Sequence, residues 1–244
     1  MKTEKIMGLP VDQLTYCDVL YDLPQYLDTE QKMSIVSVNP QIVVKGQSYP
    51  DVVEFIENST HRIPDGIGIV LVSKLTGGMI NERVAGFEMM VKFLEYANIH
   101  KRSAFFYGAQ SDILIDAIKN IQQTYPDLII AGSIDGYTAL TEDQIVEQIN
   151  DARPDFLFVA LGFPRQEQWL NRNLERVKAT VFQDVGGSID VLSGHVKRAP
   201  QFFLDYHLEW LYRSLSNPTR IGRIFQLPVF VIRSLWWKIK INKK

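Results

Sequence analysis

Five short segments, each with consecutive apolar residues at its centre, recur along the chain, at residues 34–38, 103–107, 127–131, 155–161 and 180–184. Such segments are typical of strands that are buried on both faces of a parallel sheet. Between them, apolar residues recur at helical spacing over 87–97, 112–125 and 142–152. Because strands that alternate with helices form right-handed βαβ crossovers, the pattern predicts an α/β fold with a mainly parallel, Rossmann-like sheet flanked by helices.

The length of 244 residues suits one α/β domain with an appendage. We expect the domain to cover residues 1–196, with a smaller N-terminal α/β half over 1–100 and a second half over 101–196. Residues 197–244 form a basic, helical C-terminal appendage in this interpretation.

Charge is distributed unevenly over these parts. From Lys197 onward, ten lysines and arginines stand against Asp205 and Glu209, whereas the rest of the chain carries 16 basic and 26 acidic side chains. An acidic body with a basic, aromatic tail predicts an anionic partner for the tail, which is a membrane surface, a nucleic acid or a phosphorylated ligand.

The last segment, 224–241, is apolar and aromatic, with Trp236 and Trp237 close to lysines. This composition favours a helix in the lipid headgroup layer; the alternatives are a helix docked on the protein's own core and an interface of a homo-oligomer. No run of 18 apolar residues predicts a spanning helix, and the chain opens without a signal-peptide pattern. With a single cysteine, Cys17, we expect a cytoplasmic protein, peripheral on the inner face of the membrane.

Glycine-bearing loops follow the predicted strands, whose carboxyl ends share one edge of the sheet. Ligands of such sheets bind outside that edge, where the strand order reverses. We therefore expect one crevice lined by Gly108, Gly136, Tyr137, Gly162, Gln166 and Gly187. Pro164 suits the first turn of a helix, whose amides are expected to face an anion at the end of the strand. Tyr137 is interpreted either as a stacking platform for a base or as a core side chain.

The first half of the chain adds polar candidates. Asp65 stands between Pro64 and Gly66, where a substrate can approach the backbone closely; the alternative is an Asp that organises a turn. A dinucleotide loop is rejected here, because no third glycine follows Gly68 and a strand–loop–helix order is not expected.

Three further side chains have two interpretations each. Ser37 and Asn39, at the exit of the first strand, either bind a sugar or nucleotide or cap the next helix. Arg83 either pairs with a diphosphate or forms a surface salt bridge that contributes little.

Several separated motifs together resemble the WecG/TagA/CpsF glycosyltransferase family. They follow the family's order from about residue 34 to residue 223: Pro64-Asp65-Gly66, Arg83-x-x-Gly86, Gly162-x-Pro164-x-Gln166-Glu167-x-Trp169, Arg198-Ala199-Pro200, Glu209-Trp210-x-x-Arg213 and Pro218-x-Arg220-x-x-Arg223. Glu88 departs from the family, which usually carries Asp there.

The resemblance implies roles for particular residues. Asp65 is the expected general base, with the acceptor in the first half of the chain and the nucleotide in the second. Arg213, Arg220 and Arg223 are expected to stabilise the departing diphosphate, since no Asp-x-Asp metal motif occurs and neither a metal nor another cofactor is expected. The expected substrate-binding residues are Ser37, Asn39, Arg83, Gly108, Gly136, Tyr137, Gly162, Gln166, Glu167, Gly187 and Asp190.

Within the family, the basic appendage is most like that of the wall teichoic acid enzymes. This implies an inverting transfer of N-acetylmannosamine from its uridine diphosphate (UDP) to N-acetylglucosamine on undecaprenyl diphosphate, with a β-1,4 link. The alternatives are another UDP-sugar donor, such as N-acetylmannosaminuronic acid, in surface polysaccharide synthesis, and a non-catalytic protein that binds a nucleotide or lipid diphosphate at the membrane. A nucleic-acid partner is not expected, because the body is acidic.

Overall fold

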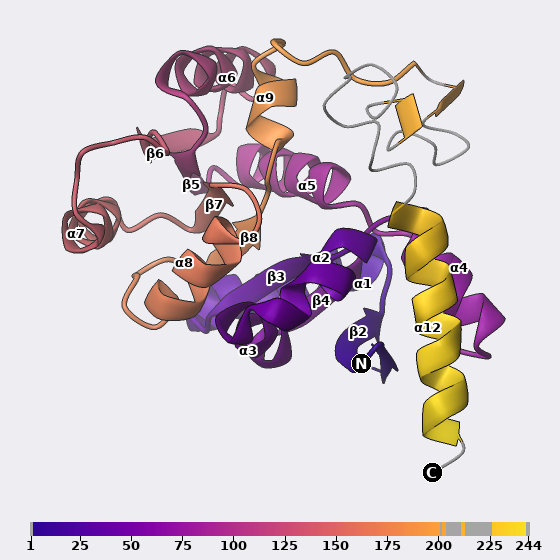
Figure 1. The fold of residues 1–244 in the computed structure, drawn as a ribbon. Helices are drawn as coiled ribbons and strands as arrows, with labels where there is room; N and C mark the ends of the chain where they lie inside the picture. Colours follow the sequence, from indigo (N-terminus) through magenta and orange to yellow (C-terminus); the bar gives the residue numbers. More distant parts are fainter. Residues whose placement is uncertain (1, 201, 204–210, 213–225, 243–244) are drawn as a thin grey trace.

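The computed structural model describes residues 2–200, 202–203, 211–212 and 226–242 (Figure 1). Its centre is a sheet of six parallel strands in the order β4-β3-β8-β7-β5-β6. The strands are β3 (Met33–Val38), β4 (His61–Pro64), β5 (Ser103–Gly108), β6 (Ile129–Ile134), β7 (Phe156–Ala160) and β8 (Val181–Asp184). The predicted α/β class and mainly parallel sheet are confirmed.

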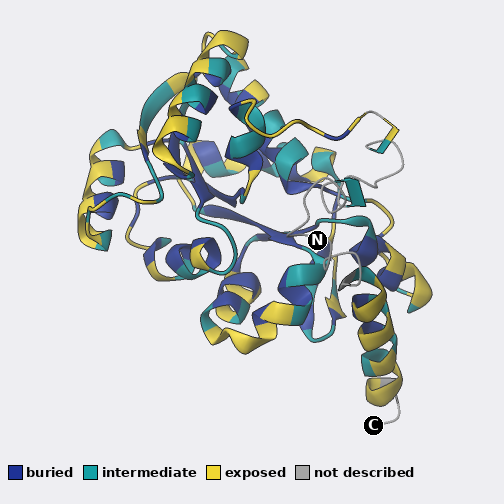
Figure 2. Ribbon diagram, turned by 45° about the horizontal axis from the view of Figure 1, so that its top comes forward, coloured by how far each residue is buried: buried dark blue, intermediate teal, exposed yellow. Residues whose placement is uncertain are grey.

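Helices cover both faces of this sheet, which explains the nearly continuous apolar strands. One face packs against α2 (Pro40–Lys45), α3 (Pro50–Asn58), α7 (Glu142–Ala152) and α8 (Arg165–Asn173). The other packs against α1 (Tyr16–Thr29), α5 (Gly86–Ile99), α6 (Ser111–Thr124) and α9 (Ser188–Leu192). Figure 2 shows the strands as a buried layer between these helices.

Neighbouring residues of one strand enter opposite cores, as a pleated strand requires. In β7, Leu157 and Val159 belong to the first core, whereas Phe156 and Phe158 belong to the second. The sequence also located α7 correctly: Thr141 and Gln144 form the predicted capping box at its N-terminus.

The N-terminal region holds an antiparallel hairpin that the sequence analysis missed, formed by β1 (Lys2–Ile6) and β2 (Leu9–Gln13). Asp12 of β2 is fully buried and accepts hydrogen bonds from the backbone N–H and the Nε of Arg62, at 2.9 and 3.0 Å. The hairpin is thereby tied to β4, the edge strand of the main sheet.

The order of elements around Asp65 corrects the sequence analysis. β4 is followed by a turn at Asp65 and Gly66 and then by α4 (Ile67–Leu75), so the order is strand–loop–helix after all. The strand was missed because it has only four residues, of which His61 and Arg62 are polar. Gly66 has φ +92°, a conformation that L side chains rarely adopt.

The C-terminal helix α12 (Gln226–Asn242) packs alongside α4 and α2 (Figure 1). Phe230 is fully buried there, and Leu227 reaches the backbone of α4 at Gly68. The opposite side of α12 is exposed and carries Val229, Ile232, Trp236 and Ile239. Within the described residues, no helix is both long and apolar enough to cross a membrane.

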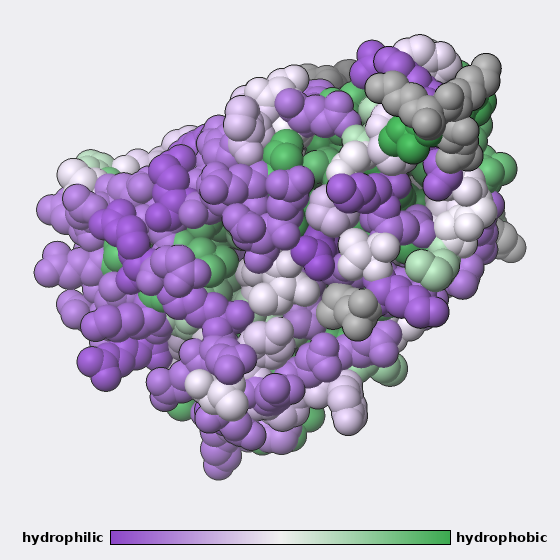
Figure 3. All heavy atoms as spheres, turned by 90° about the horizontal axis from the view of Figure 1, so that it is seen from below, coloured by the Kyte–Doolittle hydropathy of each residue, from purple (hydrophilic) through white to green (hydrophobic). Residues whose placement is uncertain are grey.

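Most of the face shown in Figure 3 is hydrophilic, and hydrophobic side chains gather there only in small separate areas. The body of the protein is therefore covered by polar side chains on this side, as the 22% of charged residues in the sequence suggests.

Candidate active site

The carboxyl edge of the sheet brings together most of the predicted site residues that the structure describes. From β3 the chain continues to β4 at one end of the sheet, and from β5 it continues to β6 at the other end. β8 and β7 lie between β3 and β5. Such a reversal of direction opens a crevice at the carboxyl ends of the central strands. Here the strands whose carboxyl ends border this crevice are β3, β8 and β7.

Gln166, in the first turn of α8, connects these exits. Its Oε1 accepts hydrogen bonds from the backbone N–H of Gly162, after β7, and of Gly186, after β8, at 3.2 and 3.1 Å. Its Nε2 donates to Glu167 Oε1 at 2.9 Å and to Asp184 Oδ2 at 3.4 Å. Because the side chain is only 5% exposed and uses its whole hydrogen-bonding capacity internally, it holds loops in place in this structure.

Glu167 and Asp184 form a buried carboxyl pair on either side of this amide. Burial raises the pKa of Glu167 to about 7. Burial and the charge of Glu167 raise the pKa of Asp184 well above its ordinary value, although the backbone N–H of Ser37 donates to Asp184 Oδ1 at 2.9 Å. Two carboxyls with raised pKa values in one site favour a state that retains a proton near neutral pH.

Asp65 lies at the same edge, next to this pair. Its backbone N–H donates to Val38 O at 2.9 Å, and this hydrogen bond holds the carboxyl end of β4 next to the carboxyl end of β3. A Cβ placed on Gly86 would stand 3.9 Å from Asp65 Oδ2 and 2.5 Å from Ser37 Oγ. The charge of Asp65 contributes to raising the pKa of Asp184 on one side and of Tyr16 on the other. Asp65 therefore stands between the buried carboxyls and the region of Tyr16.

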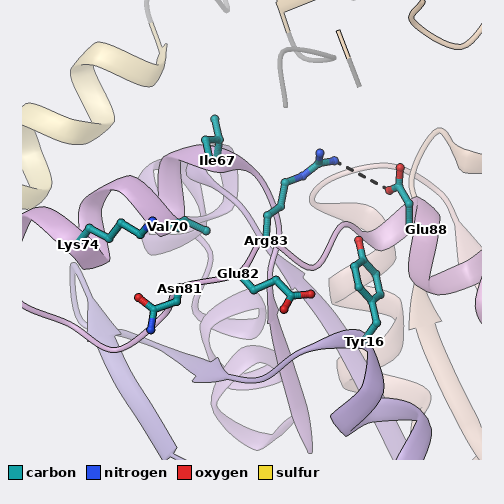
Figure 4. Close-up of a pocket in the computed structure, with 8 residues that line it drawn as sticks. All are labelled: Tyr16, Ile67, Val70, Lys74, Asn81, Glu82, Arg83 and Glu88. Carbon is teal, nitrogen blue, oxygen red and sulfur yellow. Dashed lines mark ion pairs between the residues drawn. The ribbon is translucent and has the colours of Figure 1, made fainter. Parts of the chain in front are cut away.

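Tyr16 lines a pocket of about 480 Å³ (Figure 4). Asp65 is not one of the lining residues, but it lies two residues before Ile67, which is one, and its charge acts on Tyr16. Ile67 and Val70 of α4 form its apolar part, and its polar lining consists of Tyr16, Lys74, Asn81, Glu82, Arg83 and Glu88. The Tyr16 hydroxyl accepts a hydrogen bond from the backbone N–H of Ala85 at 2.7 Å, and burial raises its pKa to about 12.

Arg83 points toward Glu88 in this pocket, with Nη2 and Oε2 3.9 Å apart (Figure 4). Glu88 also forms an ion pair with Arg198 of the Arg-Ala-Pro segment. Arg198 in turn lies over the ring of Phe87, 4.8 Å from its centroid. The first turn of α5 and the segment that leads toward the C-terminal region are thereby joined at the rim of the pocket.

The remaining predicted residues lie along the edge, with different surroundings. Asn39 caps α2, its Oδ1 accepting from the backbone N–H of Ile42 at 3.0 Å, as the capping interpretation requires. Gly108 has φ +129°, and a Cβ there would stand 2.3 Å from Ala160 O. Gly136 adjoins Gly108, its N–H bonded to Ala109 O at 2.8 Å. Tyr137 is 72% exposed, which excludes the core interpretation for it.

Two helices, α8 and α9, begin at this edge. Gly187 and Asp190 lie at the N-terminus of α9, close to each other. In α8, the expected free amide of Gln166 instead donates to Gly162 O at 3.1 Å, so that part of the anion-site prediction was wrong. The helix begins at Arg165, directly after Pro164.

Arg213, Arg220 and Arg223 lie outside the described residues, so their expected roles stay predictions. In the part of the chain that is described, no three His, Cys, Asp or Glu side chains come together as metal ligands.

Sequence analysis missed Asp184, Tyr16 and Lys74. An acidic residue at the carboxyl end of a predicted strand was the available signal for Asp184. Tyr16 and Lys74 carry no local signal, because their place at the pocket depends on how α1 and α4 pack.

We expect ionisation of Glu167 to lower the free energy of unfolding. Its pKa rises from 4.5 to about 7 on folding, so its stabilising contribution is complete below pH 4.5 and is lost as the pH rises toward 7. The loss is about 3 kcal/mol at pH 8. Urea unfolding of wild type and Glu167→Gln between pH 5 and about pH 8 measures it.

The difference in free energy of unfolding between these two proteins should change with pH in that range. The matched control is Glu175→Gln, because Glu175 is exposed and forms a surface ion pair with Lys32. Parallel pH profiles for wild type and Glu167→Gln would contradict the ionisation assigned to Glu167.

Comparison with known proteins gives a consistent result over the whole chain. The model of the glycosyl transferase WecG/TagA/CpsF family matches residues 4–244. A Bacillus subtilis protein, named N-acetylglucosaminyldiphosphoundecaprenol N-acetyl-beta-D-mannosaminyltransferase, is 36% identical over 245 residues, covering 100% of this chain and 94% of its own.

Proteins of the same name from two other bacteria are similar. The one from Bacillus spizizenii is 36% identical over 228 residues, which cover 91% of this chain and 88% of the relative. The one from Staphylococcus aureus strain MW2 is 31% identical over 240 residues, which cover 98% and 94%. The family predicted from separated motifs is therefore confirmed: this chain belongs to the WecG/TagA/CpsF glycosyltransferase family.

Proposed function

We propose that this protein transfers N-acetylmannosamine from UDP-N-acetylmannosamine to undecaprenyl-diphosphate-linked N-acetylglucosamine, forming the β-1,4 link of the wall teichoic acid linkage unit. The observation that carries the proposal is the position of Asp65. It lies at the carboxyl edge of the sheet, beside the strand exits and next to an open pocket, in a chain that matches transferases of this name over nearly its full length.

In the proposed reaction, Asp65 takes the proton from the attacking hydroxyl of the acceptor sugar. The hydroxyl oxygen forms a bond to the anomeric carbon from the face opposite the diphosphate, and the bond from that carbon to the diphosphate oxygen breaks. UDP leaves with the electron pair of that bond, and the configuration at the anomeric carbon is inverted.

The donor is proposed to lie along the exits of β8, β7, β5 and β6. Glycines at 108, 136, 162 and 187 allow the backbone to approach it closely. The exposed ring of Tyr137 can stack on uracil, and Ser37, Asn39 and Asp190 lie along the same edge as polar contacts. Gln166 and Glu167 are proposed to serve the donor by fixing the loops at Gly162 and Gly186.

The acceptor is membrane-bound, and α12 is suited to meet it. Its buried side packs on the protein, while its exposed side carries an apolar strip next to Arg233 and Lys240. The Lys240 ammonium lies 5.3 Å from the ring centroid of Trp236. This combination of apolar, aromatic and basic side chains supports a place for α12 on the anionic inner face of the membrane.

The proposed function is tested by UDP release and sugar transfer. The purified protein is mixed with UDP-N-acetylmannosamine and lipid-linked N-acetylglucosamine, in anionic vesicles and in detergent. We expect transfer in both, with faster turnover in vesicles because α12 concentrates the protein at their surface.

Two alternatives have different outcomes in this assay. Turnover only with UDP-N-acetylmannosaminuronic acid would identify another donor for the same fold. Binding of donor and acceptor without any UDP release would instead favour a non-catalytic binding protein, and equal rates in vesicles and detergent would contradict the role of α12.

Removing the charge of Asp65 tests its role as the base. Asp65→Asn should lower kcat by about 10²–10⁴ while donor binding persists, because the amide can no longer take the proton. Asp112→Asn, an exposed change in α6, is the matched control. Near-full activity of Asp65→Asn would place the base elsewhere.

The tail arginines are tested in the full-length protein, because deletion would also remove the packing of α12 on α4. Changing Arg213, Arg220 or Arg223 to Gln should lower kcat by about 10²–10³ by removing charge that stabilises the departing diphosphate. Arg153→Gln, outside the edge, is the control. Undiminished kcat in all three variants would refute the role of these arginines.

A further inference from the structure

Helix α4 has three neighbouring strips with different surroundings. Ile67, Val70 and Lys74, spaced three and four residues apart, share one strip and line the pocket beside Asp65. Gly68, on another strip, is covered by α12, since a Cβ there would stand 2.6 Å from Leu227 Cδ1. The helical rotation of 3.6 residues per turn places Leu71 and Leu75 between these two strips.

Leu71 and Leu75 are apolar but exposed, by 40% and 55% of their surface. They lie one helical turn apart, at the border between the pocket and α12. α12 packs alongside α4 (Figure 1), and its exposed side carries the apolar side chains of Ile232 and Trp236. An apolar chain that leaves the pocket over Leu71 and Leu75 would therefore arrive at α12.

The pocket has the mixed polarity that a sugar requires. The exposed side chains of Asn81 and Glu82 offer hydrogen-bond donors and acceptors for hydroxyl and acetamido groups, and Ile67 and Val70 supply apolar contacts (Figure 4). Glu88 does not present an uncompensated charge, because it is paired with Arg83 and Arg198.

Lys74 adds a positive charge at the last turn of α4, on the strip that lines the pocket and directly before Leu75. Its side chain is exposed, and no ion pair joins it to another described residue. A lysine ammonium in this position suits the oxygens of a phosphate group.

We propose that this pocket and the exposed strip of α4 form the acceptor site. The acceptor sugar occupies the pocket with its reacting hydroxyl toward Asp65, Lys74 binds the diphosphate, and Leu71 and Leu75 contact the first part of the lipid chain. The inference rests on the proposed function and adds the direction in which the acceptor lies, from Asp65 outward along α4 to α12. The donor, which has no apolar chain, does not use this strip.

The test compares two acceptors in detergent, N-acetylglucosaminyl diphosphate on a long polyprenyl chain and on a short alkyl chain. Lys74→Ala should raise the KM of both acceptors about tenfold, because both carry the diphosphate, and should leave the KM of the UDP-sugar unchanged. Leu71→Ser and Leu75→Ser should raise the KM of the long-chain acceptor more than that of the short-chain acceptor, which has less apolar chain to lose. These three positions are exposed, so the variants are expected to fold.

Matched controls come from α6 on the other face of the sheet, where Lys119→Ala and Ile115→Ser change equally exposed positions. Both should leave all KM values unchanged. Unaltered acceptor KM in the α4 variants, or an equal rise in the KM of the donor, would overturn the acceptor site while leaving the proposed function intact.

A binding measurement without donor distinguishes a failure of the acceptor site from a failure of the proposed function. Titration calorimetry with the short-chain acceptor, without donor, should show about tenfold weaker binding to Lys74→Ala than to wild type. That result would support the site even if wild type transferred no sugar, an outcome that would reject the proposed function alone. Equal binding to both proteins, or no binding to wild type, would reject the site.

Discussion

The side chain of Gln166 makes the four hydrogen bonds on which the geometry of the site depends. Through them the loops after β7 and β8 and the carboxyl groups of Glu167 and Asp184 have fixed positions relative to one another. Asp184 extends the network to β3 through the N–H of Ser37. Buried polar groups are costly unless they are all satisfied, so such a network permits few alternative arrangements of these loops.

This constraint also relates the two substrates to each other. Asp65 is fixed to β3 by its own backbone hydrogen bond to Val38. In our account, the donor lies on the side of the loops that Gln166 holds, and the acceptor lies on the side of α4. A general base that stands between the two needs no large movement to reach the attacking hydroxyl, which is the advantage of positioning in catalysis.

Sequence alone predicted the parts of the fold that have a regular apolar pattern. The buried strands and α7 with its capping box were found because each has a local signal. The β1–β2 hairpin and β4 were missed, since His61, Arg62 and Asp12 are polar residues that find their partners only across the fold.

The candidate site shows the same limit. The glycines were expected at one edge because topology alone brings the carboxyl ends of parallel strands together, and they do lie there. Asp65 was singled out by its motif and not by topology, since β4, which carries it to the same edge, was missed. The internal bonding of Gln166 was not foreseen, since it depends on Gly186, which is 20 residues away in the sequence. For α12 the docked interpretation is confirmed for one side of the helix, whereas the headgroup-layer interpretation stays a prediction for the exposed side.

The most direct test of the central claim is a crystal structure of the protein with the UDP-sugar bound. Our account predicts that the diphosphate and sugar lie across the exits of β8 and β7, with the anomeric carbon facing Asp65 and the pocket beside Tyr16. A donor bound at the opposite edge of the sheet, or with its anomeric carbon turned away from Asp65, would contradict the account.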